Sequence, residues 1–168
     1  MTNKAFDNDC GSCQAIQGLI TLTNAPRILE TPHWIIEHVH PTSVQGWLVI
    51  VLNRHCNALH QVTTDEFTSL GQLLQLVSQA LHTILKTEKE YVIQLAEGKG
   101  FHHVHFHVIA RLPDWPTSLT GPSVFNGFGS QIEKPLSSEV LTPLALEIRK
   151  YLLAHLNDER AIQNRMTM

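Results

Sequence analysis

The chain has 168 residues, of which 43% are hydrophobic and 16% are charged, and its formal net charge at pH 7 is −3. This length and apolar content fit one domain with a real core, whereas the net negative charge argues against a broad nucleic-acid-binding surface. No apolar run approaches the roughly 18 residues of a membrane helix, and the N-terminus lacks the apolar segment of a signal peptide. We therefore expect a cytoplasmic protein of one domain with neither nucleic acid nor a membrane as partner, although a local phosphate site remains possible.

The first motif is C-G-S-C at residues 10–13, which follows a polar segment, expected to be loose, at residues 1–9. Such a pair fits a redox site, half of a zinc site, or chance, and a reducing compartment disfavours a structural disulfide. A thioredoxin-like site requires a helix directly after the pair, and residues 14–23 show no helical periodicity. A zinc site would need two further ligands from elsewhere in the chain.

Strand patterns follow this motif. Residues 27–30 and 33–38 are typical of two short strands that are interrupted by the Thr-Pro pair at 31–32. A loop at residues 40–43 then leads to a long apolar strand at residues 46–53.

The clearest helix begins after Thr63, which can form a capping box with Glu66. Apolar residues then recur at helical spacing and predict a stripe that faces the core: Phe67, Leu70, Leu73, Leu74, Val77, Leu81, Ile84 and Leu85. Residues 91–96 are typical of a strand that pairs with the histidine-rich segment after it. The loop between them, residues 97–100, contains glycines that let a backbone approach a phosphate closely.

The sequence F-H-H-V-H-F-H-V-I at residues 101–109 is the most informative stretch. If it is extended, one face carries His103, His105 and His107, and the opposite face carries the apolar residues between them. This strict alternation disfavours a merely solvated polar face. Residues four apart on a strand lie about 13 Å apart, so His103 and His107 cannot ligate one ion together. At most two of the three can share a metal, and a neutral imidazole near pH 7 suits acid/base or nucleophilic chemistry at phosphorus.

The last third of the chain begins with a Pro/Gly-rich loop at residues 112–137, and loops of this length are usually functional or mobile. A terminal helix is expected at residues 138–156, with Thr142 as cap and Pro143 as first helical residue, and with the residues before them as a backward extension. Residues 157–168 are expected to form a polar tail.

The motif H-V-H-F-H-V-I at residues 103–109 resembles the His-hydrophobic-His-hydrophobic-His-hydrophobic-hydrophobic signature of the histidine triad (HIT) superfamily of nucleotide hydrolases and transferases. The similarity includes G-K-G-F at residues 98–101, where many members have Gly-Gln-Ser/Thr-Val. It also includes residues 46–55, which are similar to the family's Gly-His-x-Leu-Val-hydrophobic-Pro-Lys-x-His strand and turn. Overall, residues 10–115 resemble the family domain. The resemblance implies an α+β fold with a core at residues 10–111, in which an antiparallel sheet of about five strands packs with one long helix and a C-terminal helix.

The resemblance also implies a mechanism. His105 would attack the α-phosphorus of a nucleoside phosphate ester, anhydride or phosphoramidate, and His107 would donate to the phosphate or to the departing group. The covalent nucleotidyl-histidine would then release a nucleoside monophosphate on hydrolysis. By the same resemblance, the residues that contact the nucleotide are His38, Lys99, Gly100 and Trp115. Lys99 and Gly100 stand where relatives commonly carry Gln and Ser or Thr, so one phosphate-binding hydroxyl is absent at this position.

In the bacterial, zinc-carrying branch of the family, the C-x-x-C pair joins a histidine after the apolar strand and the first triad histidine. The resemblance therefore implies a structural zinc site made of Cys10, Cys13, His55 and His103, with no metal required for the chemistry. It further implies a homodimer, whereas Cys56 is expected to lie in the core.

Three functions remain open from the sequence. The first is a nucleotide hydrolase acting on dinucleoside polyphosphates or phosphoramidates. The second is a nucleotide-binding regulatory module with incidental hydrolysis, which measured turnover would separate from the first. The third is a metalloenzyme that places a catalytic metal on two of the triad histidines, which loss of activity in a strong chelator would identify.

Overall fold

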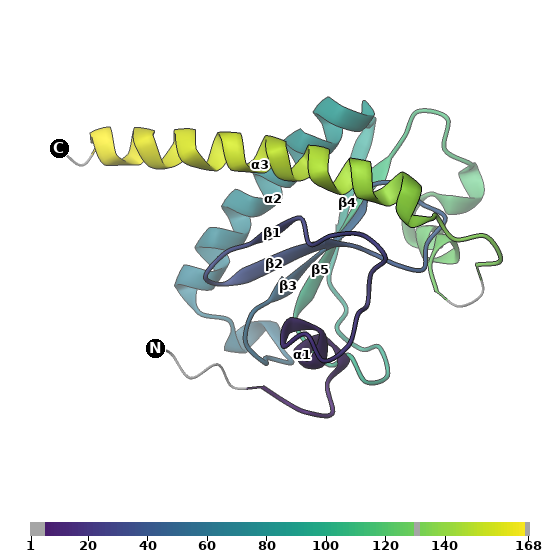
Figure 1. Ribbon diagram of the computed structural model, residues 1–168, viewed down its shortest axis with the longest axis horizontal. Coiled ribbons are helices and arrows are strands. Elements are labelled where there is room, and N and C mark those ends of the chain that lie inside the picture. Colours follow the sequence, from purple (N-terminus) through teal and green to yellow (C-terminus); the bar gives the residue numbers. More distant parts are fainter. Residues whose placement is uncertain (1–5, 130–131, 167–168) are drawn as a thin grey trace.

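The computed structural model describes residues 6–129 and 132–166, so most of the segment expected to be loose, residues 1–5, lies outside the described residues. The strands are β1 Leu29–Glu30, β2 Trp34–His38, β3 Trp47–Leu52, β4 Lys89–Ile93 and β5 His105–Arg111. The helices are α1 Gly11–Ile16, α2 Thr64–Leu85 and α3 Ser138–Met166, with 3-10 turns η1 Leu59–Gln61, η2 Thr117–Leu119 and η3 Gly121–Gly127. The strands form one antiparallel sheet in the order β1-β2-β3-β5-β4, with α2 and α3 together on one side and α1 apart from them (Figure 1). The expected α+β fold, and the pairing of β4 with the triad strand β5, are therefore confirmed.

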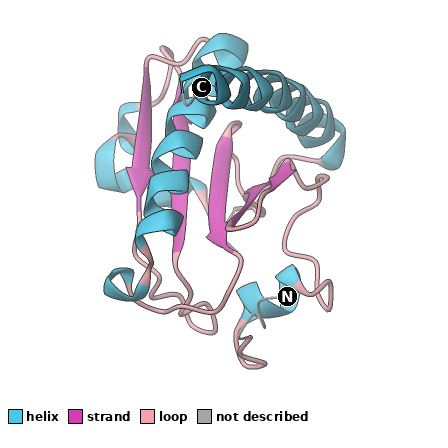
Figure 2. Ribbon diagram, turned by 90° about the vertical axis from the view of Figure 1, so that its left-hand side faces the viewer, coloured by secondary structure: helices cyan, strands magenta, loops and turns pink. Residues whose placement is uncertain are grey.

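The sheet has two chemically different faces because side chains alternate along each strand. One face packs against α2 and α3, which cover it in Figure 2, through the main core residues of its central strands: Trp34, Ile36, Leu48, Ile50, Leu52, Phe106, Val108 and Ala110. Burial of each of these large side chains stabilises the fold by roughly 1.5–3 kcal/mol. A slip of β5 by one residue would turn its histidines into this core, so the apolar face fixes the register.

Helix α2 begins as the sequence predicts, because Thr63 and Glu66 form both hydrogen bonds of the capping box. The expected inward orientation of Phe67 is wrong, since 42% of its side chain is exposed. The first turn instead points Glu66 inward, where its carboxylate binds Arg54 and its carbonyl oxygen accepts a hydrogen bond from Trp34. Phe67 follows one residue later, about 100° further round the helix, and therefore faces outward.

Helix α1 was not expected, because residues 14–23 show no helical periodicity. It begins directly within the C-G-S-C motif, with a backbone hydrogen bond from Gln14 to Cys10 and another from Gln17 to Cys13. A helix of six residues is shorter than the window over which an amphipathic period can be recognised.

Helix α3 begins at Ser138, the start of the expected range 138–156, but its cap and its C-terminal end differ from the expectation. The carbonyl oxygen of Ser137 accepts the first backbone hydrogen bonds, so Thr142 is not its cap and Pro143 is not its first residue. Pro143 lies inside the helix, where its missing N–H deprives only the exposed Glu139 of a backbone partner. The helix also continues through residues expected to be a tail, as far as Met166, because that segment contains neither Gly nor Pro and is rich in helix-forming residues.

The long loop after β5 packs onto the sheet face opposite the main core. Its turn η3 contributes Val124 to a second buried cluster with Trp47 and Ile109. The hydroxyl of Thr42 donates to the carbonyl oxygen of Gly127 at 2.7 Å, which anchors this segment to the loop before β3. No helix in residues 6–129 and 132–166 has the combination of length and apolarity that crossing a bilayer requires.

Replacing either of two glycines by alanine tests the packing of this fold, because one change should destabilise the protein and the other should stabilise it. Gly46 has a φ of +79°, and a Cβ there would lie 2.5 Å from Leu85 Cδ1 and 2.8 Å from Ala110 Cβ. Gly46→Ala should therefore lower the free energy of unfolding by about 2–4 kcal/mol through backbone strain and overpacking. The control, Gly71→Ala, places a methyl group in open space within α2 and should stabilise the protein by up to about 1 kcal/mol. Urea unfolding measures both values, and equal effects of the two substitutions would contradict this account.

Candidate active site and metal centre

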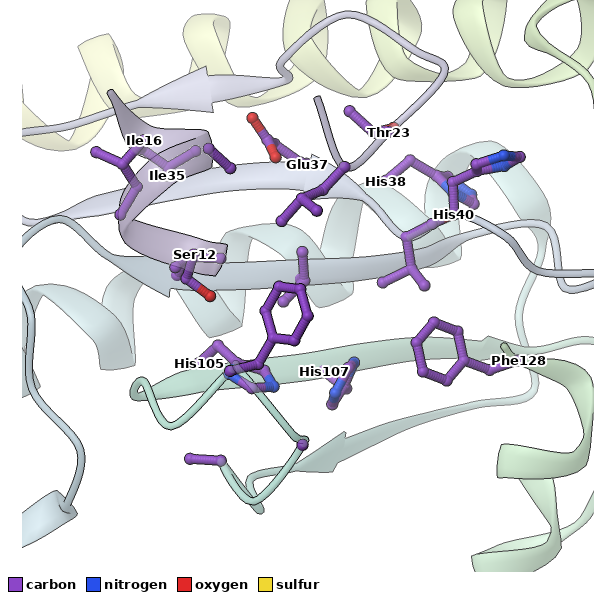
Figure 3. Close-up of a pocket in the computed structure, with 18 of the residues that line it drawn as sticks. Ser12, Ile16, Thr23, Ile35, Glu37, His38, His40, His105, His107 and Phe128 are labelled. Atoms are coloured by element: carbon purple, nitrogen blue, oxygen red, sulfur yellow. The ribbon is translucent and has the colours of Figure 1, made fainter. Parts of the chain in front are cut away.

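A cavity of about 330 Å³ lies on the sheet face opposite the main core (Figure 3). Apart from His38 at the end of β2, its lining from the strands comes from alternate residues of the three central strands: Ile35, Glu37, Val49, Val51, His105 and His107. The strand register places His105 in one row with Val51 and Ile35, and His107 in the next row with Val49 and Glu37. Residues of α1, of η3 and of several loops, including residues 95–98 between β4 and β5, complete the lining.

His105 has a defined tautomer. Its Nδ1 lies 2.7 Å from the carbonyl oxygen of His103, and because a carbonyl only accepts, Nδ1 carries the proton. The lone pair is therefore on Nε2. Burial lowers the pKa of His105 below its ordinary value, against the opposing effect of this hydrogen bond, so the ring is neutral at pH 7. A neutral ring with a free Nε2 can act as a nucleophile or as a base.

His107 has the opposite hydrogen-bond arrangement. Its Nδ1 accepts a hydrogen bond of 3.0 Å from the indole N–H of Trp47, which can only donate, so the ring proton of His107 is on Nε2. Burial, and secondarily His105, lowers the pKa of His107 to about 3. The two rings stand edge to face with centroids 5.0 Å apart. The cavity thus holds one imidazole with an available lone pair beside one that has an N–H to donate.

A second cluster lies next to the cavity, at the start of β5. Its ligand atoms all fall within 4.8 Å of one another and belong to Cys10, Cys13, His55 and His103. Cys13 Sγ lies 3.3 Å from His55 Nδ1 and 3.5 Å from His103 Nδ1, and Cys10 Sγ lies 3.5 Å from His103 Nδ1. A tetrahedral zinc with Zn–S of about 2.3 Å and Zn–N of about 2.0–2.1 Å requires sulfur–nitrogen separations of roughly 3.6 Å. The four residues therefore fit a tetrahedral zinc ion.

The surroundings of the cluster agree with this fit. His103 Nε2 donates to the carbonyl oxygen of Leu52 at 2.7 Å, which leaves its Nδ1 unprotonated and facing the thiols. His55 Nε2 lies 3.6 Å from a carboxylate oxygen of Asp7, within ion-pair range. Burial raises the pKa of the Cys13 thiol to about 11, so a thiolate here needs a cation to stabilise it. Cys56 is 2% exposed and lies in the main core, as expected.

The structure corrects one expectation about the triad. β5 begins only at His105, and His103 is fully buried with its ring among the thiols rather than on the cavity face with His105 and His107. The hydrogen bond from the Val104 N–H to the carbonyl oxygen of Cys56 belongs to this irregular approach to the strand. Among the described residues, the one group of three or more potential metal ligands is this cluster, and it contains neither His105 nor His107.

The residues expected to contact a nucleotide are not all brought together. His38 lines the cavity, but both ring nitrogens are bonded to backbone, Nδ1 to the carbonyl oxygen of Val39 and Nε2 to the N–H of Gly46. This leaves no ring nitrogen of His38 for a ribose hydroxyl. Lys99 and Gly100 are exposed, and Trp115 packs against the second buried cluster; none of the three lines the cavity.

The sequence analysis missed several residues of the site. Glu37 faces the cavity and is paired with Arg27, whose Nε lies 2.9 Å from its carboxylate. Strand alternation outward from the buried Trp34 would have placed Glu37 on this face. Ser12 and the indole donor Trp47 had no comparable signal, because their roles depend on contacts between segments that are distant in sequence.

Comparisons with known proteins agree with this geometry. A family model described as the HIT domain matches residues 23–114, more than half of the chain. A search of curated proteins gives no significant match.

Solved structures share the fold at low sequence identity. A Hit-like protein from Bartonella henselae, described as involved in cell-cycle regulation, aligns with a TM-score of 0.65 and 18% identity over 88% of this chain and 99% of its own. A histidine triad nucleotide-binding protein from Sulfolobus tokodaii gives a TM-score of 0.65 and 17% identity, covering 86% of this chain and 93% of its own. A zinc-bound histidine triad family protein from Mycobacterium smegmatis gives a TM-score of 0.61 and 18% identity, covering 89% of this chain and 96% of its own.

The metal cluster generates a prediction with an internal control. Freshly purified, reduced protein should contain about one zinc per chain, and Cys13→Ser should lose most of it together with thermal stability, because metal binding contributes to folding free energy. Cys56→Ser, a substitution of the same kind in the core, should retain the metal. Elemental analysis and thermal unfolding measure both effects. Metal-free wild-type protein, with Cys10 and Cys13 freely alkylated under native conditions, would overturn the site.

The buried His38 should make the free energy of unfolding depend on pH. It is 1% exposed, and burial lowers its pKa from 6.5 to about 4. Between these values the unfolded chain binds a proton that the folded chain does not, so the free energy of unfolding falls as the pH drops through this window. The loss attributable to His38 is on the order of 3 kcal/mol at most. His38→Leu should therefore show a shallower dependence of unfolding free energy on pH than wild type, when both are measured in the same metal state. Parallel curves would contradict the prediction.

Proposed function

Because the chain belongs to the HIT domain family, we propose that it is a nucleotide hydrolase that cleaves at the α-phosphate through a covalent intermediate on His105. The observation that carries this proposal is the complementary pair of tautomers in the cavity. His105 offers a lone pair at Nε2, and His107 offers an N–H at Nε2, on two neutral rings 5.0 Å apart. A phosphoryl transfer needs a nucleophile and a donor side by side.

In the first step, His105 Nε2 attacks the α-phosphorus, the phosphorus–nitrogen bond forms, and the bond to the leaving group breaks. The Nδ1 proton remains on the ring, so the carbonyl oxygen of His103 stabilises the positive charge that develops there. His107 donates its Nε2–H to a phosphate oxygen or to the departing group. In the second step, water attacks phosphorus and releases a proton to solvent, the phosphorus–nitrogen bond breaks with its electron pair returning to His105 Nε2, and the nucleoside monophosphate leaves.

We further propose that Cys10, Cys13, His55 and His103 hold a structural zinc ion. Bound there, zinc would supply a closed tetrahedral cross-link rather than a reactive position. The link would join α1 to the start of β5, two residues before the nucleophile. Metal at this site would therefore affect activity through the placement of His105.

The leaving group defines the substrate class. We propose dinucleoside polyphosphates or nucleoside phosphoramidates, since the cavity is lined mainly by apolar side chains that can accommodate a nucleoside next to the imidazole pair. One of the structural neighbours is described as nucleotide-binding, and another as involved in cell-cycle regulation. Incubation with diadenosine polyphosphates, adenosine 5′-phosphoramidate and ADP, followed by mass spectrometry of the products, tests the proposal. Binding of these compounds without turnover would instead favour a regulatory module.

The role of His105 leads to a mutational prediction. His105→Ala should lower kcat on the order of 10³-fold or more, because the covalent route is lost, while thermal stability and nucleotide binding change little. The control is His102→Ala, which alters an exposed neighbouring histidine and should leave the rate unchanged. A rapidly quenched reaction should also show a nucleotide bonded to His105 that is labile in acid and stable in base. Activity of His105→Ala within about tenfold of wild type would overturn the assignment.

A further inference from the structure

Ser12 presents a side-chain hydroxyl to the cavity. Its side chain is 6% exposed and lines the same cavity as His105. Within residues 6–129 and 132–166, its hydroxyl has no hydrogen-bond partner. Figure 3 shows the Ser12 oxygen directed toward the side of the cavity on which His105 lies. A hydroxyl that opens onto the cavity and has no partner among the described residues is free to donate to a bound ligand.

Two contacts hold Ser12 next to the approach to β5. The N–H of Gly11 donates to the carbonyl oxygen of Gly100 at 2.8 Å. Gly11 also lies against the ring of Phe101, since a Cβ at residue 11 would fall 2.6 Å from Phe101 Cε1. Residues 11 and 12 therefore lie beside the loop at residues 98–101, from which the resemblance to the HIT superfamily implies a phosphate-binding hydroxyl that this chain lacks at Gly100.

The charges around the cavity explain why a neutral donor is needed at this point. Arg27 is the cationic side chain in the lining, and it is already paired with Glu37 and Glu30. His105 keeps its Nδ1–H on the carbonyl oxygen of His103, and His107 has only its Nε2–H to donate. A phosphate placed against His105 must therefore be bound mainly by uncharged N–H and O–H groups.

We propose that Ser12 is a phosphate-binding residue, whose hydroxyl donates to a non-bridging oxygen of the nucleotide phosphate held against His105. This inference rests on the proposed function and identifies a contact that replaces the absent hydroxyl at position 100. Because Ser12 lies between Cys10 and Cys13, it also places a substrate contact inside the metal-binding segment. The metal cluster then positions both the nucleophile, through His103, and a donor to the phosphate, through Ser12.

Calorimetric binding isolates this contact from the rest of the nucleotide. The ligands are the four ribonucleoside 5′-monophosphates, each compared with its matching nucleoside. Ser12→Ala should weaken binding of the best monophosphate by roughly 10- to 100-fold, the range for a hydrogen bond to a charged group. Binding of the matching nucleoside should stay within about twofold of wild type, because no phosphate is present. Ser12→Thr, which keeps a hydroxyl, should restore most of the monophosphate affinity.

Controls separate this role from a structural one. Ser123→Ala makes the same change at an exposed serine outside the cavity and should affect neither ligand. Zinc content and thermal unfolding of each variant show whether the fold is retained, and Ser12→Gly provides the same deletion if the alanine variant does not fold. Equal losses for nucleotide and nucleoside would overturn the phosphate contact, as would no loss for either. If wild-type protein binds none of the monophosphates, the proposed function falls together with this inference.

Discussion

The hydrogen bond from His105 Nδ1 to the carbonyl oxygen of His103 is the contact on which the site depends. It fixes which nitrogen of His105 can react, and it does so through a residue whose own position is set by other contacts. The ring of His103 is held between the carbonyl oxygen of Leu52 and the thiols of Cys10 and Cys13. The first triad histidine therefore links the metal cluster to the reactive pair. A disturbance at the cysteines would reach His105 through only two residues of backbone.

The sheet makes this arrangement possible because one of its faces packs in the core and the other carries the cavity. Its core face contributes apolar side chains to the packing against α2 and α3, and its other face carries the cavity. Because the two faces alternate residue by residue, the packing that fixes the register of β5 also fixes where His105 and His107 point. The irregular approach to β5 releases His103 from this alternation, so that three histidines spaced two residues apart serve two different sites.

Several residues of the cavity differ from the pattern that the sequence resembles, and the differences are connected in space. Trp47 stands where the related motif has a histidine, and its indole N–H, which can only donate, fixes the tautomer of His107. Gly100 lacks the hydroxyl expected there, whereas Ser12, from a segment hydrogen-bonded to Gly100, directs a hydroxyl into the cavity. His38 has both ring nitrogens engaged by backbone, and Glu37 provides the polar group on that strand instead.

The sequence by itself determined the features that depend on local periodicity: the strands around residues 27–53, the capped helix α2, and the alternation that places His105 and His107 on one face. It also indicated, through the resemblance, the four residues that converge as the metal cluster. It could not show the short helix α1, the inward turn of Glu66 or the full extent of α3, because short elements and helix ends carry weak periodic signals. Only the tertiary structure decided that His103 leaves the cavity face, that Trp47 fixes the tautomer of His107, and that Ser12 lines the same cavity as His105. Each of these depends on contacts between segments 50 to 90 residues apart, whose approach is set by packing of the whole sheet rather than by any local pattern.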